Sequence, residues 1–247
     1  MNKLPLLNVF EKPYELWEVR NQTPEEMMQS GCMFKRIKVK LKARLHDHVD
    51  AAKHMILEGT DNQLERFIKD YLKKSASFKE IRSQMPSKTP KSLSDYQRRF
   101  QRATFEQVSI DINNCGKILS DDQYLFHGGL LPINIGESFI TERPFSTSFC
   151  PQIALRNAEW GGKAYDAGEV NLCVLRTVSS QTKTFIFRLN GTDKGHEVEV
   201  LFAAGAKITL RNKVEIRNCN VYKACRLHPG RLLKKEIPFY LVEVDIS

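Results

Sequence analysis

Three short patches in the second half of the chain carry side chains that could do chemistry together. The first is Phe-His-Gly-Gly at 126–129, where paired glycines after a strand let the backbone approach a ligand closely. The second is Phe-Ser-Thr-Ser-Phe at 145–149, which places three hydroxyls between two aromatic rings. The third is Glu-Val-Glu-Val-Leu-Phe at 197–202. In a strand its two carboxylates would share a face, repel each other and perturb each other's pKa.

Each patch also has a purely structural explanation. A paired glycine is typical of a tight turn, and His127 would then be a surface residue. A following helix would use one hydroxyl of the serine patch as its N-cap and leave the other two unexplained. A solvated edge strand would tolerate two carboxylates, whereas the face of an active site would use them.

The elements before residue 116 are predicted to be mainly helical. Start signals, stop signals and 3.6-residue periodicity predict helices over 24–30, 45–58, 61–74 and 95–112, a strand or exposed edge over 34–41, and a loop over 83–94. Asp61 can cap the third helix, and a capping box of Ser94 and Gln97 is expected to start the fourth.

The elements after residue 116 are predicted to be mainly strands. Short apolar runs, separated by Gly, Asn and Asp, lie at 123–127, 137–141, 171–178, 183–189, 197–202, 207–210, 221–227 and 239–246. One helix, over 150–160, interrupts them. We therefore expect an α+β chain in which a helical, basic N-terminal region (1–116) precedes a mostly antiparallel β-rich core (117–247).

Together the three patches resemble the ADP-ribosyltransferase superfamily, in the branch of bacterial toxins and vertebrate ecto-enzymes whose signature is Arg, Ser-Thr-Ser and Glu-x-Glu. Residues 134–148 resemble that branch's approach to its Ser-Thr-Ser strand, and 197–209 resemble its catalytic-glutamate strand. The order fits as well, with 19 residues from His127 to Ser146 and 53 more to Glu199. The resemblance covers 117–247 and implies an ADP-ribosyltransferase-like β-sandwich core. Residues 1–116 resemble the family only in being a generic helical region that precedes this core.

The resemblance implies that NAD is the co-substrate. Cleavage of its nicotinamide–ribose bond develops positive charge on the ribose, which a carboxylate beside the sugar would stabilise. Glu199 matches the glutamate with that role, Ser146 would orient it, and Glu197 would position or deprotonate the acceptor. The Gly128 backbone would bond the nicotinamide amide. The implied cofactor-binding residues are His127, Gly128, Gly129, Arg143, Ser146, Thr147 and Ser148, and no metal is expected.

One position departs from this branch of the superfamily. His127 stands where the branch normally has arginine, whereas histidine there is typical of the other branch, the diphtheria-toxin and poly-ADP-ribose polymerase type. The chain therefore resembles a His–Ser–Glu hybrid, which is either a working variant or a degenerate enzyme. In a working variant, His127 would bond a ribose hydroxyl and Arg143 would bind the phosphates. The loop 188–196 corresponds to the family's substrate-recognition turn.

The function implied by the resemblance is mono-ADP-ribosyl transfer from NAD to a protein side chain. Glu-x-Glu resembles enzymes directed at arginine, and a chain of this kind resembles an injected bacterial virulence effector or the catalytic part of a toxin, acting on a host protein. The alternatives are an NAD glycohydrolase, a catalytically degenerate basic interaction module, and a transferase directed at nucleic acid.

Composition and charge narrow the class of protein. With 41% hydrophobic and 27% charged residues in 247, the chain is expected to fold with a real core, so fibrous and fully disordered classes are excluded. Six scattered cysteines form neither a disulfide framework nor a zinc pattern, which favours free thiols in a reducing compartment.

No apolar run is long enough to span a bilayer, and we find no classical signal peptide, although a dedicated secretion system remains open. Residues 35–102 hold 18 Lys and Arg against 8 Asp and Glu, which leaves open an acidic or nucleic-acid partner.

Overall fold

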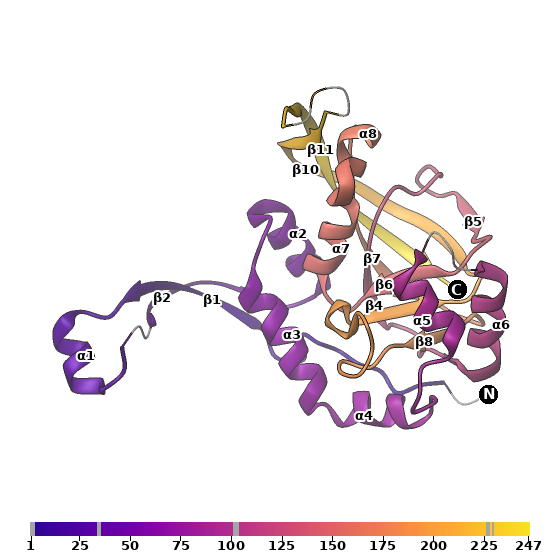
Figure 1. The fold of residues 1–247 in the computed structure, drawn as a ribbon, viewed down its shortest axis with the longest axis horizontal. Coiled ribbons are helices and arrows are strands. Elements are labelled where there is room, and N and C mark those ends of the chain that lie inside the picture. Colours follow the sequence, from indigo (N-terminus) through magenta and orange to yellow (C-terminus); the bar gives the residue numbers. More distant parts are fainter. Residues whose placement is uncertain (1–2, 34–35, 101–103, 226–227, 229) are drawn as a thin grey trace.

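The dominant element of the protein is one large, mostly antiparallel sheet. The computed structural model describes residues 3–33, 36–100, 104–225, 228 and 230–247. Within them, nine strands follow the order β3-β8-β9-β6-β4-β7-β11-β10-β5. Figure 1 labels all of these strands except β3 and β9. Their bounds are β3 Lys117–Ile118, β4 Tyr124–Gly128, β5 Ser138–Ile140, β6 Phe145–Ser148, β7 Val170–Thr177, β8 Lys183–Ile186, β9 Glu199–Phe202, β10 Lys207–Ala224 and β11 Leu232–Ile246. The predicted α+β character and the mostly antiparallel sheet are confirmed, and one pair, β7 with β11, is parallel.

The sheet consists of two blocks that meet at a narrow seam. Strands β4 and β6 share a single residue pair, Phe126 with Ser148, whereas every other junction in the sheet has at least two pairs. The block β3-β8-β9-β6 therefore joins the block β4-β7-β11-β10-β5 only at this point. Two of the three chemical patches, those containing His127 and Ser146, lie on the two strands of the seam.

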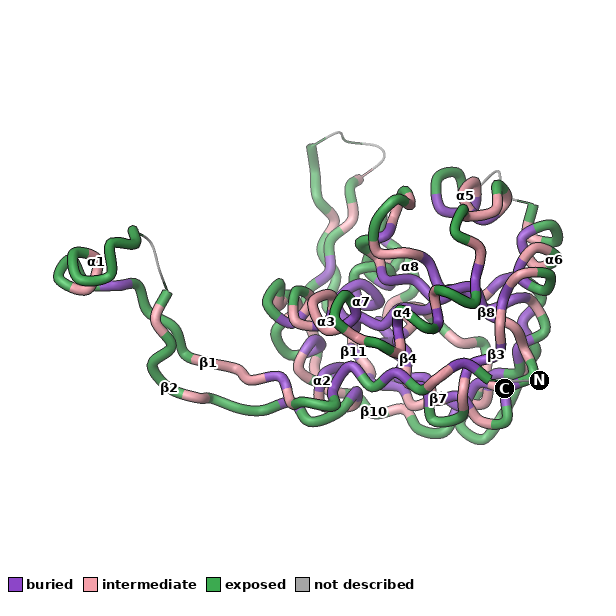
Figure 2. Tube along the Cα trace, turned by 90° about the horizontal axis from the view of Figure 1, so that it is seen from below, coloured by how far each residue is buried: buried purple, intermediate pink, exposed green. Residues whose placement is uncertain are grey.

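The N-terminal region contains a feature that the sequence analysis described only in part. Strands β1 (Tyr14–Asn21) and β2 (Arg36–Leu45) pair with each other in a separate two-stranded ribbon, and helix α1 (Pro24–Ser30) lies at its far end. The ribbon extends away from the body, and its outer half and α1 are largely exposed (Figures 1 and 2). The predicted strand over 34–41 corresponds to β2, although positions 34–35 lie outside the described residues, and β1 was not predicted.

Five helices follow the ribbon along the chain. They are α2 His48–Glu58, α3 Asn62–Lys74, α4 Ala76–Ser83, α5 Lys91–Arg98 and α6 Phe105–Cys115. The Asp61 side chain caps α3 as predicted, by accepting bonds from the backbone N–H groups of Gln63 and Leu64. Helix α4, which lies next to the predicted loop, was not predicted.

The predicted helix over 95–112 with a Ser94–Gln97 capping box is wrong. Two helices occupy this part of the chain, and positions 101–103 between them lie outside the described residues. Ser94 is already inside α5, whose N-cap is Pro90. A capping box needs a serine at the N-cap, and the Ser94 hydroxyl instead bonds Asp193, far away in the sequence.

The β-rich part also differs from prediction in several places. The runs at 207–210 and 221–227 belong to one long strand, β10, although 226–227 lie outside the described residues. A short helix, α8 (Lys163–Ala167), accompanies the predicted helix, which is α7 (Pro151–Glu159). Strand β9 begins at Glu199 rather than at 197, because the chain preceding it is wound into a tight turn.

Two of the N-terminal helices, α2 and α6, pack directly on the sheet. Buried residues run through both the helices and the strands of the body (Figure 2). Their apolar side chains form a single cluster that runs from Leu4 to Ile246, and α2 and α7 both contact β7. The predicted boundary at residue 116 separates helical from β-rich sequence, and whether it separates two domains stays a prediction. No helix in the described part of the chain is long and apolar enough to cross a membrane.

Asp61 joins the base of the ribbon to the helices. Its carboxylate accepts bonds from the hydroxyl of Tyr14 at the start of β1 (3.1 Å) and lies 3.0 Å from Nε2 of His54 on α2. Its backbone N–H donates to the Gln152 side chain on α7. One carboxylate thus holds together the ribbon, α2 and α3, and its own backbone connects them to α7.

We expect Asp61→Ala to lower the free energy of unfolding by about 2–4 kcal/mol, because it removes a helix cap and leaves the Tyr14 hydroxyl without its acceptor. Urea denaturation measures the change. Asp70→Ala is the matched control, since Asp70 is half-exposed on the same helix and forms only a 3.9 Å pair with Lys73. That control should change stability by less than about 0.5 kcal/mol. Equal small losses in both variants would contradict the role assigned to Asp61.

Candidate active site

The center of the site is a buried carboxylate, Glu199, at the first position of β9. Strand β6 pairs with β9 so that Ser148 lies opposite Glu199, which puts Ser146 at a diagonal position on the same face. The Ser146 hydroxyl donates to Oε1 of Glu199 at 2.6 Å. The predicted proximity of these two residues is therefore present in the structure.

The other two hydroxyls of the serine patch are occupied by the chain itself. The Thr147 hydroxyl donates to the carbonyl of Val200, on the opposite face of β6. The Ser148 hydroxyl donates to the carbonyl of Glu197 at 2.8 Å and accepts from the N–H of Cys150 at the start of α7. Both residues are buried and hold β6 against its neighbors. Their predicted contact with NAD stays a prediction.

Glu197 does not lie on the strand, so the same-face argument for the two glutamates is wrong. It ends a short 3-10 turn, η3 (Gly195–Glu197), and Val198 then adopts a left-handed conformation with φ 44°. The turn is tight because Gly195 packs against the Leu189 carbonyl, where a Cβ would approach to 2.4 Å. The Glu197 carboxylate forms a 3.4 Å pair with Lys194, and its side chain is 21% exposed, whereas Glu199 is 5% exposed.

His127 bridges the seam between β4 and β6. Its Nδ1 lies 2.8 Å from the Ser146 carbonyl, and its ring packs on Phe145 with 4.4 Å between ring centroids. Because a carbonyl only accepts, Nδ1 carries the proton and donates it. Burial lowers the pKa of His127 to about 4, against the opposing effect of this hydrogen bond, and the charges of Lys163 and Arg143 lower it further. The imidazole is therefore neutral near pH 7, with Nε2 as an acceptor.

The paired glycines have a packing role that the sequence analysis did not foresee. A Cβ on Gly128 would lie 1.7 Å from the carbonyl oxygen of Ala154, so α7 can approach β4 only because this residue is glycine. A Cβ on Gly129 would lie 3.0 Å from Nε2 of His127. Glycine at 129 thus leaves that nitrogen uncovered. The predicted contact of the Gly128 backbone with nicotinamide is not tested by these contacts.

Gln97 is a site residue that the sequence analysis missed. Its side chain, on α5, donates from Nε2 to Oε2 of Glu199 at 2.9 Å and is 3% exposed. The two residues are 102 positions apart, and a single glutamine in a helical stretch carries no signal of such a contact. Glu199 is therefore held on one oxygen by Ser146 and on the other by Gln97.

The surroundings of Glu199 raise its pKa above the ordinary range. Burial is the main cause, and the nearby charge of Glu197 adds to it. The hydrogen bonds from Ser146 and Gln97 and the charge of Lys194 oppose the shift. The carboxylate is thus removed from water, and its ionised form depends on the few donors aimed at it.

Arg143 lies outside this cluster of hydrogen bonds. It is exposed, and its guanidinium lies 5.9 Å from the center of the Phe105 ring on α6. Its charge nevertheless acts on two groups of the site. It adds to the lowering of the His127 pKa that burial causes, and it opposes the rise that burial and the Glu199 charge cause in the pKa of Tyr96. Its predicted role in phosphate binding stays a prediction.

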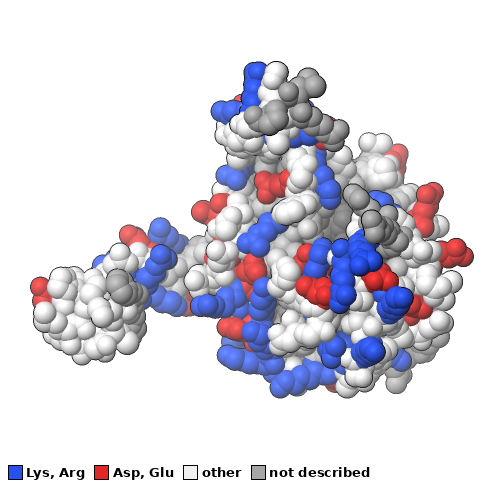
Figure 3. Space-filling model, in the orientation of Figure 1, with Lys and Arg blue, Asp and Glu red and all other residues white. Residues whose placement is uncertain are grey.

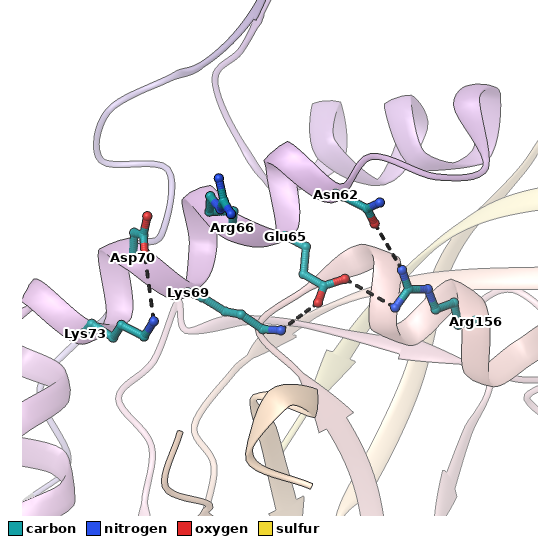
Figure 4. Close-up of a pocket in the computed structure, with 7 residues that line it drawn as sticks. All are labelled: Asn62, Glu65, Arg66, Lys69, Asp70, Lys73 and Arg156. Carbon is teal, nitrogen blue, oxygen red and sulfur yellow. Dashed lines mark hydrogen bonds and ion pairs between the residues drawn. The ribbon is translucent and has the colours of Figure 1, made fainter. Parts of the chain in front are cut away.

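A hollow of about 320 Å³ lies away from these residues, on the surface between α3 and α7 (Figure 4). Its lining residues are Asn62, Glu65, Arg66, Lys69, Asp70, Lys73 and Arg156. None of them is a predicted site residue, and most of their charges pair with one another, such as Glu65 with Lys69 at 2.6 Å. Among the residues that the structure describes, no group of three His, Cys, Asp or Glu side chains could hold a metal ion.

Comparison with known proteins gives matches among solved structures only. No protein-family model and no curated protein matches the chain. It is similar to the Vis toxin of Vibrio splendidus in complex with agmatine, at 14% identity over 76% of this chain and 86% of that one, with a TM-score of 0.45. It is also similar to Plx2a and C3larvin of Paenibacillus larvae, each at 10% identity and a TM-score of 0.40, over 74% and 70% of this chain and 96% of theirs.

All three are described as ADP-ribosyltransferases. The structural neighbors therefore come from the superfamily that the sequence motifs resemble. At these identities and TM-scores the likeness is remote.

We expect the His127 imidazole to show no titration above about pH 5 when its ring signals are followed by NMR, because burial holds its pKa near 4. The neutral ring should keep its proton on Nδ1 throughout this range. The imidazole signal that disappears in the His127→Asn variant is assigned to His127. A midpoint near the ordinary value of about 6.5 would show that the ring is solvated, and would contradict its place in the seam.

Proposed function

We propose that the chain is a mono-ADP-ribosyltransferase that uses NAD and modifies a protein side chain. The observation that carries this proposal is the buried Glu199 carboxylate, held on one oxygen by Ser146 and on the other by Gln97. A carboxylate fixed in this way, shielded from water, suits a reaction that develops positive charge on its substrate. The resemblance of the motifs supplies the identity of that substrate.

The site has groups that fit a sugar next to an amide. Glu199 presents a carboxylate, and the buried Oε1 of Gln97 has no partner among the described residues. Nε2 of the neutral His127 adds a further acceptor. Ribose hydroxyls and the nicotinamide amide can donate hydrogen bonds to these three acceptors.

The chemistry follows from charge. The bond between ribose C1′ and the nicotinamide nitrogen breaks with its electron pair leaving on nicotinamide, and positive charge develops on the ribose. The Glu199 carboxylate stabilises that charge, and Ser146 keeps the carboxylate in position. The acceptor nucleophile then forms the new bond to C1′ and loses a proton, for which Glu197 is the proposed base. Its partial exposure beside Lys194 suits a group that meets an acceptor arriving from solvent.

We further propose that the acceptor is arginine and that the protein is a toxin or secreted effector acting on a host protein. Both proposals rest on the resemblance of Glu197-x-Glu199 and of its flanking loop to arginine-directed toxins. The NAD glycohydrolase alternative uses the same Glu199 and differs only in taking water as the acceptor.

The degenerate alternative is less well supported. A decayed site would have no need to hold His127 in place, whereas here the partly buried ring bonds the Ser146 carbonyl and packs on Phe145. The alternative directed at nucleic acid has only charge in its favor. Lys and Arg are prominent on the ribbon and on the adjoining edge of the body, with Asp and Glu among them (Figure 3).

Glu199→Gln should lower the rate of NAD cleavage by roughly a hundredfold or more, because the amide keeps the shape of the side chain and removes its charge. Release of nicotinamide measures the rate. Glu236→Gln makes the same change at an exposed position of β11 and should leave the rate unchanged. A parental rate in Glu199→Gln would overturn the mechanism.

Glu197→Ala should separate transfer from hydrolysis. If Glu197 serves the acceptor, transfer of labelled ADP-ribose to protein should fall by roughly a hundredfold, since general-base catalysis contributes about that much. Nicotinamide release without acceptor should stay within about threefold of the parent. Equal loss of both activities would assign Glu197 to the ribose or to the fold, and retention of both would leave the base unidentified.

A further inference from the structure

Gln97 approaches Glu199 from a part of the chain that carries none of the three motifs. It lies on α5, and both its side chain and that of Glu199 are at least 95% buried. The 2.9 Å bond from Nε2 to Oε2 of Glu199 is therefore made away from water. A hydrogen bond to a charged group in such surroundings is stronger than one at the surface.

The helix that carries Gln97 is fixed at several points. The Ser94 hydroxyl donates to Asp193 at 3.1 Å, and Arg98 pairs with the same carboxylate oxygen at 2.5 Å. Asp193 belongs to the loop 188–196, which leads directly to Glu197. Ser92 donates to Asp111 on α6, so α5 is also held against its neighboring helix. These contacts fix the position of Gln97 relative to β9.

The chemistry of the contact decides how the Gln97 amide is oriented. An ionised carboxylate only accepts hydrogen bonds, so the NH2 group must face Glu199 and Oε1 must point elsewhere. That oxygen is buried and has no partner among the described residues. A buried acceptor without a donor is costly, and a ligand that brings a hydroxyl or amide donor would relieve that cost.

We propose that Gln97 is a positioning residue of the active site, which holds the Glu199 carboxylate through Nε2 and accepts a hydrogen bond from the bound substrate through Oε1. This inference rests on the proposed function, since it takes Glu199 as the catalytic carboxylate. It assigns a part of the active site to α5, a segment that the motif resemblance does not cover.

The groups around Glu199 determine its pKa, so the positioning role of Gln97 can be tested by a change in that pKa. Glu197 from η3 raises the pKa of Glu199, and Lys194 from the same loop lowers it. Ser146 from β6 and Gln97 from α5 lower it through hydrogen bonds, and Tyr96 of α5 lies close enough to feel the Glu199 charge. Burial raises the pKa of Glu199 and the hydrogen bond from Gln97 lowers it. If the Gln97 donor is removed, the effect of burial is opposed by one hydrogen bond fewer, so the pKa of Glu199 must rise.

The test compares Gln97→Leu with the parent protein across a pH series of nicotinamide release. Leucine matches the volume of the side chain and removes both polar atoms. We expect kcat to fall roughly ten- to a hundredfold at neutral pH, and the acidic limb of the profile to move to higher pH. Gln97→Glu keeps the shape but adds a like charge beside Glu199, and it should move the limb further in the same direction.

Gln29→Leu is the matched control, because it makes the same substitution at an exposed position of α1, at the far end of the ribbon, and should keep the parental profile. A Gln97→Leu variant with the parental rate and profile would overturn the proposal. A faster Gln97→Leu variant would overturn it too, since Gln97 would then obstruct the site rather than position Glu199.

A second measurement separates this inference from the proposed function. The carboxyl 13C signal of Glu199, assigned with Glu199→Gln, reports its titration directly and needs no NAD. If the parent does not cleave NAD but the Glu199 midpoint rises in Gln97→Leu, the contact is upheld while the function fails. If the parent cleaves NAD and the midpoint is unchanged, the function stands and the role of Gln97 is wrong.

Discussion

The arrangement of the site depends on removing one carboxylate from water. Glu199 opens a strand whose other residues, Val200, Leu201 and Phe202, are fully buried, so its charge has to be satisfied by the protein itself. Ser146 supplies one donor from the paired strand and Gln97 supplies the other from a helix. The register of β6 on β9 and the position of α5 are therefore coupled through a single side chain, and a shift of either would leave a buried charge with too few partners.

The seam between the two blocks of the sheet explains why His127 lies against the Ser146 backbone. A continuous ladder would use the backbone groups of β4 and β6 on each other, but only Phe126 and Ser148 pair. Beyond that pair, the His127 imidazole spans the gap between the strands and donates a hydrogen bond to the Ser146 carbonyl. A side-chain hydrogen bond thus stands where two paired strands would form a backbone hydrogen bond. Gly128 allows α7 to pack closely behind the same strand. The seam is thus held by side chains rather than by backbone pairing, and these side chains are the ones that the motifs identify.

The sequence predicted the parts of this arrangement that depend on local pattern. The strand carrying His127 and the helix over 150–160 follow from an apolar run and helix signals. The strand carrying Ser146 and the contact of Ser146 with Glu199 follow from the resemblance. The same-face argument for Glu197 failed because a left-handed Val198 and a close-packed Gly195 begin the strand two residues late. Contacts between segments far apart in the chain could not be predicted from the sequence, because no local pattern marks them. Ser94 has the local pattern of a capping box, yet Asp193 uses its hydroxyl instead.

The N-terminal half of the chain is therefore more than support for a catalytic core. The motif resemblance covers only 117–247, and those residues alone would expose the Glu199 carboxylate on the side that Gln97 now covers. Loss of α5 would also free Asp193 from Ser94 and Arg98, and with it the loop that leads to Glu197. Both glutamates are thus tied to α5, one through the amide of Gln97 and the other through the loop. The hydrogen bonding of the proposed catalytic carboxylate thus depends on a helix that none of the three motifs includes.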